Sequence, residues 1–190
     1  EQGKLTEELK KQILAAETMV VVEDLYRPYR PKRRTRAMIA KEKGLEPLAA
    51  LITLQKAEKP IEVYAEEYVN PEKEVKSVKE AIDGAKDIIA ESVSDEADYR
   101  SWIRKATVQH GKVISQAKDE KAESVYEMYY DFEEPVTKLA GHRVLALNRG
   151  EKEKFLTVKI EAPQDDILRY LEKKMIHSDN PHTTPILKEV

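Results

Sequence analysis

The sequence contains no cysteine among its 190 residues. This absence excludes disulfides, thiolate metal sites and a cysteine nucleophile. Glycine is scarce as well: its six residues are scattered, and no phosphate-binding loop or dinucleotide fingerprint is present. No apolar run approaches the roughly 20 residues that span a bilayer, and no signal peptide opens the sequence. We therefore expect a cytoplasmic globular chain with no cofactor and no membrane partner.

Charged residues make up 36% of the sequence and hydrophobic residues 41%. This balance is too apolar for a disordered protein and too polar for a membrane protein. The length suffices for one substantial domain or two small ones. Because the first residue is Glu1 rather than methionine, we expect a segment of a longer polypeptide. We assign residues 1–178 to a helical region of one or two subdomains, and residues 179–190 to a polar tail or linker.

Apolar residues recur three and four positions apart along most of the chain, which predicts a mainly α, multi-helical fold. We expect helices at residues 5–26, 35–43, 46–55, 65–69, 75–89, 95–110, 136–148 and from Asp165 onward. Clean alternation predicts a strand at 155–161, and a second short strand is expected near 111–117. The aromatic-rich segment 120–132 is expected to pack on a core rather than to stack on bases, because its neighbours are acidic.

Residues 35–55 form a candidate helix-turn-helix-like unit. Gly44 is able to adopt positive φ at the turn, and Pro47 suits the first turn of the second helix. A DNA-reading unit would need Arg, Lys, Asn or Gln on the exposed face of that second helix. The helix offers mainly leucine, alanine and isoleucine instead, so we interpret the unit as packing rather than base recognition.

The segment Tyr26–Arg36 carries six basic side chains and no acid, in a chain whose formal net charge is −3. Two prolines, Pro28 and Pro31, predict an extended connector between helices. Arginine suits phosphate, and an adjacent tyrosine can stack on an unpaired base. The candidate nucleic-acid-binding residues are Tyr29, Arg30, Lys32, Arg33, Arg34 and Arg36.

An alternative for the same segment is a solvated loop whose arginines pair with the many carboxylates elsewhere in the chain. Because the connector is held between helices, we expect Tyr26 and Arg27 to pack inward and the later residues to face out. The direction in which the arginines point distinguishes phosphate binding from internal pairing.

No catalytic residue is assigned, because no spacing of serine, histidine and acid suggests a catalytic set. His177 and His182 flank Asp179, and this group could ligate an ion. Since they lie in the expected tail, without a fixed scaffold, we expect them to face solvent. The sequence thus predicts a protein that is not an enzyme and has no metal site and no small-molecule substrate.

Four segments in order along the chain resemble the bacterial Tex family of transcription accessory proteins. They are residues 23–37, 40–49, 80–91 and 141–151, and together they cover nearly the whole chain. The resemblance implies an internal piece of the amino-terminal helical region. In the family a ribonuclease-H-like domain, helix-hairpin-helix units and a carboxy-terminal oligonucleotide-binding fold follow, and that last fold is the main nucleic-acid-binding part.

These observations predict a non-enzymatic helical scaffold from a transcription accessory protein that binds RNA or DNA through its full length. The basic connector would add sequence-independent phosphate contacts. The alternative function is a protein-interaction module that docks on the transcription machinery, with the arginines bound to acidic partners or to the chain's own carboxylates.

Overall fold

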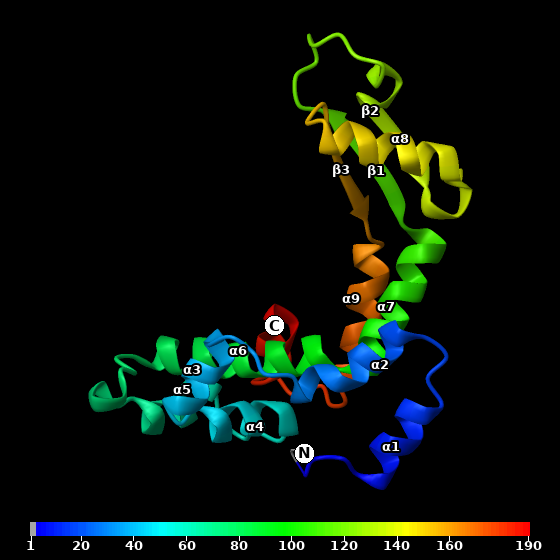
Figure 1. Cartoon of the computed structure of the whole chain (residues 1–190). Coiled ribbons are helices and arrows are strands. Elements are labelled where there is room, and N and C mark those ends of the chain that lie inside the picture. Colours follow the sequence, from blue (N-terminus) through cyan, green and yellow to red (C-terminus); the bar gives the residue numbers. More distant parts are fainter. Residues whose placement is uncertain (1–2) are drawn as a thin grey trace. The chain divides into compact units, whose positions relative to one another are not determined.

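A computed structural model describes residues 3–190, and it is mainly α with one small antiparallel sheet (Figure 1). This confirms the predicted fold class. The chain divides into two compact units. Unit 1 combines the segment that ends at Ser101 with Arg169–Val190, and unit 2 is the continuous segment Trp102–Leu168. The boundaries fall inside two helices, α7 (Ala97–His110) and α9 (Gln164–Met175).

In its described part, which starts at Gly3, unit 1 contains seven further α-helices. They are α1 (Glu7–Leu14), α2 (Met19–Tyr26), α3 (Arg36–Glu42), α4 (Glu46–Leu54), α5 (Ile61–Ala65), α6 (Val78–Asp95) and α10 (Thr184–Glu189). The longest of them, α6, has the shorter helices α3, α4 and α5 packed against it. Leu48, Ile52 and Ile61 are fully buried in the resulting core.

The turn between α3 and α4 contains Gly44 at φ +81°, a left-handed conformation that favours glycine. Leu45 follows directly and is buried against α6, where it lies beside Gly84. A Cβ atom added at Gly84 would come within 2.4 Å of Leu45 Cδ1 and 3.3 Å of Ala40 Cβ. The close approach of these helices therefore depends on the missing side chain at Gly84.

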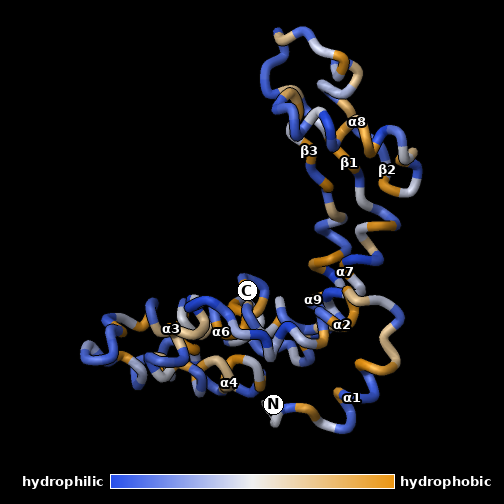
Figure 2. Tube along the Cα trace, in the orientation of Figure 1, coloured by the Kyte–Doolittle hydropathy of each residue, from blue (hydrophilic) through white to orange (hydrophobic). Residues whose placement is uncertain are grey.

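The opening helix predicted for residues 5–26 is two helices, α1 and α2, so that prediction is wrong in its continuity. Thr18 stands at the break with an extended backbone, and its hydroxyl accepts a hydrogen bond from the Val21 amide. This N-cap starts a new helix at Met19. Apolar residues occur along α1 as they do along α2, so their helical spacing does not reveal the break (Figure 2). In the structure, however, α1 contains no buried residue.

Residues 179–190 are not a tail, which corrects the sequence-based boundary. They contain α10, and Leu187 packs into the core of unit 1. The segment before α10 is ordered by Asn180, whose side-chain oxygen accepts hydrogen bonds from the His182 and Thr183 amides at 2.9 and 3.1 Å. The short apolar pair at Ile186 and Leu187 is too brief to produce a periodic signal, although Leu187 is enough to anchor the helix in the core.

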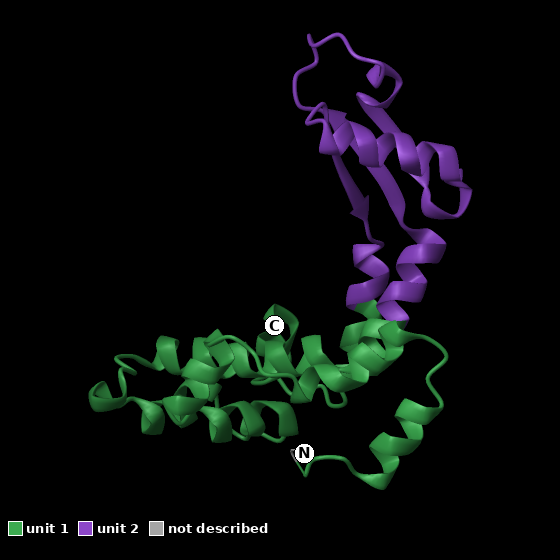
Figure 3. Cartoon of the chain, viewed as in Figure 1, with its two compact units in different colours: residues 1–101, 169–190 green, residues 102–168 purple. Residues whose placement is uncertain are grey.

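Besides its parts of α7 and α9, unit 2 contains a three-stranded antiparallel sheet with strand order β2-β1-β3 and the helix α8 (Gly141–Lys152) (Figure 3). The strands are β1 (Lys112–Ala117), β2 (Asp131–Pro135) and β3 (Leu156–Glu161). Alternate residues such as Val113 and Leu156 form the core with Leu147 of α8. The sequence predicted about two strands and missed β2, because its three acids and terminal proline disfavour a strand assignment.

The aromatic-rich segment packs on this core, as predicted, but without a long helix. It contains a short 3-10 helix, Glu127–Tyr129, directly before β2. Tyr126 and Tyr129 are buried beside Leu147 and Leu156. Gly150 of α8 lies against the same residues, and a Cβ atom there would meet Leu156 Cδ1 at 2.6 Å.

We expect unit 1 to lose stability above the ordinary tyrosine pKa. Tyr99 and Tyr170 meet edge to face with ring centroids 6.0 Å apart, and partial burial raises the pKa of both phenols above 10.0. A pKa that is higher in the folded state favours the protonated form. Its contribution to stability is complete below the unfolded-state pKa and is lost as pH rises through the folded-state pKa.

Alkaline unfolding series on the wild type and on Tyr99→Phe test this. The variant should show a shallower decline of unfolding free energy above the tyrosine pKa, because phenylalanine cannot ionise. An equally steep decline in the variant would contradict the assignment.

Candidate nucleic-acid interface

The basic segment Tyr26–Arg36 links α2 to α3 within unit 1. It begins as the short 3-10 helix Arg27–Tyr29, where Pro28 occupies an early position that tolerates its missing N–H. At Arg30 the backbone becomes extended. It reaches α3 at Thr35, whose hydroxyl caps that helix by accepting an amide hydrogen bond at 3.1 Å. We call this segment the basic connector.

Two cations of the basic connector are held by carboxylates of α6. Arg27 Nε lies 3.0 Å from Asp95 Oδ1, while the Lys32 ammonium contacts Asp95 Oδ2 and lies 3.4 Å from Glu91 Oε1. Asp95 is buried and is the last residue of α6, where the helix dipole disfavours a negative charge. The two cations offset that cost, so Arg27 and Lys32 fasten the connector to the helix.

Two further arginines pair at the surface. Arg34 lies 2.7 Å from Glu42 Oε2, and Arg36 lies 3.4 Å from Asp87 Oδ1. Their side chains are 68% and 85% exposed. Exposed pairs of this kind contribute about 0–1 kcal/mol and are screened by salt, so a phosphate can compete for either arginine.

Arg30 and Arg33 differ from the other cations of the connector. Both are exposed, and neither guanidinium makes an ion pair or hydrogen bond within residues 3–190. Their neighbours in the connector are fixed by Asp95, so the backbone that carries them is held in place. These two arginines therefore present their full set of donors to solvent.

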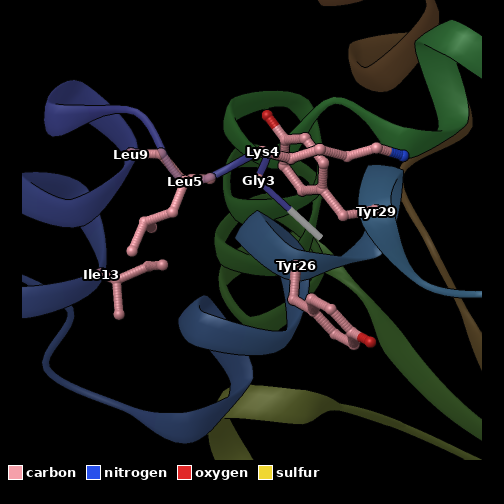
Figure 4. Close-up of a pocket in the computed structure, with 7 residues that line it drawn as sticks. All are labelled: Gly3, Lys4, Leu5, Leu9, Ile13, Tyr26 and Tyr29. Carbon is pink, nitrogen blue, oxygen red and sulfur yellow. The ribbon is translucent and has the colours of Figure 1, made fainter. Parts of the chain in front are cut away.

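Tyr26 and Tyr29 line an apolar cavity of about 370 Å³ beside α1. Figure 4 shows the two tyrosines together with Leu5 and Ile13 of the amino-terminal segment, which line the same cavity. Tyr26 is 46% exposed, so the expectation that it packs inward is wrong. Tyr29 is half-buried and contributes to this apolar surface as well as to the connector.

The structure thus brings the candidate residues together on one connector but gives them different surroundings. Lys32 is committed to two carboxylates, as the internal-pairing alternative describes. Arg34 and Arg36 are weakly paired, and Arg30 and Arg33 are open. Internal pairing therefore describes Lys32, while phosphate binding stays a prediction for the open arginines.

Sequence reasoning missed a second basic group, in the part of unit 1 that follows unit 2. Arg169, Lys173 and His177 recur at four-residue spacing along α9 and the residues after it, and all three line a cavity with Lys188 of α10. The four-residue repeat is a usable signal. The expectation of a tail at residues 179–190 concealed it, because α10 helps to close the cavity.

Within residues 3–190, no group of three or more His, Cys, Asp or Glu side chains is placed to hold a metal ion. His177 and His182 lie near the hydrogen-bonded turn formed by Asn180. Across the same residues, no helix is long and apolar enough to cross a membrane.

Comparison with known proteins places the chain among relatives much longer than itself. It is 49% identical over its whole length to the uncharacterized protein YdcI of Bacillus subtilis, covering 27% of that protein. It is 42% identical to Protein tex of Bordetella pertussis, with 87% of this chain and 21% of that protein aligned. Human S1 RNA-binding domain-containing protein 1 is 29% identical, with 89% of this chain and 18% of that protein aligned.

The chain therefore spans about a quarter or less of the length of these relatives. Residues 55–182 match the sequence profile described as Tex central region-like, which is more than half of the chain. The chain belongs to the Tex family.

Proposed function

We propose that this chain is a non-enzymatic scaffold segment of a cytoplasmic, Tex-like transcription accessory protein that binds RNA or DNA. Within it, Arg30 and Arg33 supply sequence-independent phosphate contacts. The names of two relatives support the nucleic-acid part: one is a transcriptional accessory protein Tex from Neisseria gonorrhoeae, and another is an S1 RNA-binding domain-containing protein.

The observation that carries the proposal is the pair of open guanidinium groups on a fastened connector. A free arginine-rich arm would lose conformational entropy on binding, at about 1–2 kcal/mol for each ordered backbone residue. Here Lys32 and Arg27 hold the connector on α6 before any ligand is present. Arg30 and Arg33 can therefore contact phosphates without that cost of ordering.

Salt dependence of binding tests the proposal. The chain should bind single-stranded RNA weakly at low salt, and Arg30→Ala/Arg33→Ala should weaken this binding. On single strands each phosphate contact contributes about 0.7 to the slope of log K against log salt, so the double variant should flatten the slope by about 1.4. Fluorescence anisotropy with an oligouridylate at several salt concentrations measures both quantities.

The matched control removes two lysines of unit 2. Lys118→Ala/Lys121→Ala makes the same charge change in an exposed segment and should leave the slope unchanged. Absence of binding by the wild type at low salt would refute phosphate contact by this chain. Loss of stability in Arg30→Ala/Arg33→Ala would indicate that the arginines serve the fold.

A second candidate function is docking of a protein partner, and the segment that contains α1 favours it. The side chains of Leu5 and Leu14 are exposed, and the neighbouring cavity is lined mainly by apolar atoms of Leu9, Ile13 and Tyr26. Leu5→Ser/Leu14→Ser tests this function. If the variant still binds RNA but no longer binds a protein partner, the α1 segment serves protein docking and the basic connector serves RNA binding.

A further inference from the structure

A second cavity of unit 1, of about 520 Å³, is lined by basic side chains. Arg169 and Lys173 come from α9, His177 follows that helix, and Lys188 comes from α10. Neither Lys173 nor Lys188 makes an ion pair or hydrogen bond within the described part of the chain. The cavity therefore has two uncommitted ammonium groups on different helices, with an arginine and an imidazole beside them.

The loop that joins these elements is fixed by Gln55, a buried residue at φ +55° just after α4. Its side-chain oxygen accepts hydrogen bonds from the His177 and Ser178 amides at 2.8 and 3.1 Å. Its side-chain nitrogen donates to the Met175 carbonyl oxygen at 2.6 Å. A buried amide that satisfies three backbone groups holds the start of the loop in one conformation.

The far side of the loop is fixed as well. Asn180 donates to the Ala57 carbonyl oxygen at 2.9 Å while it orders the turn before α10. The Thr184 hydroxyl donates to the Ser178 carbonyl oxygen at 3.3 Å. The walls of the cavity are therefore set before a ligand arrives, which reduces the entropy lost on binding.

Charge selects the kind of ligand. Arg169, Lys173 and Lys188 carry three positive charges, against two negative charges from Glu172 and Asp179. By contrast, the groove beside α3 and α6 is lined by three carboxylates and two cations. A compact anion is attracted to the first cavity and repelled by the second, and the Ser178 hydroxyl adds a donor.

We propose that the α9–α10 cavity binds a phosphate group of the nucleic-acid backbone, as a second contact point besides the basic connector. This inference rests on the proposed function, because it supplies further phosphate contacts of the same protein. Arginine and lysine bind phosphate oxygens through charge-assisted hydrogen bonds. An exposed mixed site of this kind fits one backbone phosphate and carries no base readout.

The test compares a double variant of the cavity with a neighbouring control. Lys173→Ala/Lys188→Ala should weaken oligouridylate binding and flatten the salt slope by about 0.7, the contribution of the one phosphate that the cavity neutralises. Lys174→Ala removes a lysine at the next position of α9, whose ammonium lies 5.8 Å from the Tyr170 ring centroid and does not line the cavity. This control should bind as the wild type does.

Backbone amide shifts locate the contact. Addition of the oligouridylate should shift the amides of residues 176–184 in the wild type and not in Lys173→Ala/Lys188→Ala. If inorganic phosphate shifts these amides and the oligouridylate does not, the cavity takes a free anion and the inference is overturned.

The two variants distinguish failure of the cavity inference from failure of the proposed function. If Lys173→Ala/Lys188→Ala binds like the wild type while Arg30→Ala/Arg33→Ala is weakened, the cavity is not a contact point and the connector still is. If the wild type fails to bind the oligouridylate at low salt, the proposed function fails for this chain, and the inference fails with it.

Discussion

Gly84→Val should destabilise unit 1 by about 3 kcal/mol, because it forces a side chain into a space that is already filled. The Cβ atom alone would lie 2.4 Å from Leu45 Cδ1 and 3.3 Å from Ala40 Cβ. Leu45 is only 1% exposed, so its side chain is held by its neighbours. Because Ala40 Cβ is close to the same point, we expect α3 and α6 to shift apart to admit the valine.

Native-state hydrogen exchange, resolved by unit, measures this effect. Amides of α3 and α6 should lose protection in Gly84→Val while those of β1 and β3 keep theirs. Gly141→Ala is the matched control, since a Cβ atom at Gly141 meets nothing within 4 Å. Unchanged protection of α6 in Gly84→Val would show that the helices are not closely packed at this point.

Arg100→Met should cost about 3 kcal/mol, at the low end of the range for breaking a buried ion pair. Asp24 of α2 is 5% exposed, and its Oδ1 accepts a hydrogen bond from Arg100 Nε at 2.9 Å. Removal of the guanidinium leaves a buried carboxylate without this partner. Arg100 is itself partly exposed, which places the expected loss at the lower limit.

A double-mutant cycle with Asp24→Asn isolates the pair. The double variant should lose less than the sum of the single variants, with a coupling energy of about 1.5–3 kcal/mol, as for hydrogen bonds to charged groups. Arg34→Met provides the comparison, because its partner Glu42 is exposed, and it should lose less than about 1 kcal/mol. Additive losses in the cycle would show that Asp24 is stabilised by other groups.

Much of the helical fold follows from residue spacing. The predicted segments 35–43 and 46–55 correspond to α3 and α4 within one residue at each end. The break between α1 and α2 could not be predicted, because Thr18 is one hydroxyl in an otherwise continuous apolar pattern. The order of the segment from Met175 to Thr183 depends on Gln55 and Asn180, whose hydrogen bonds join residues more than 120 positions apart.

The structure explains the role of two glycines in the segments that resemble the Tex family. Gly84 and Gly150 lie in two of them, and each is packed so closely that a Cβ atom would overlap a buried leucine. The sequence alone showed that these segments resemble those of the Tex family. It did not show that two of their glycines allow neighbouring elements to pack closely.

The two prolines and the run of cations located the basic connector between two helices, although Arg27–Tyr29 is a 3-10 helix and not extended backbone. Which cations are committed depends on Glu91 and Asp95, about 60 residues away along the chain. No local pattern distinguishes Lys32 from Arg33, although their surroundings differ in charge and exposure.

The insertion of unit 2 within unit 1 determines the order in which the protein can fold during synthesis. The core of unit 1 includes Leu187, and its loop at His177 is held by Gln55, so this unit cannot be completed until these late residues have been made. Unit 2 is continuous in sequence and can fold as soon as Leu168 has emerged. Domains generally fold in the order of their synthesis. Here unit 1 begins first, but its core is incomplete until α10 has been synthesised, so unit 2 can fold before it.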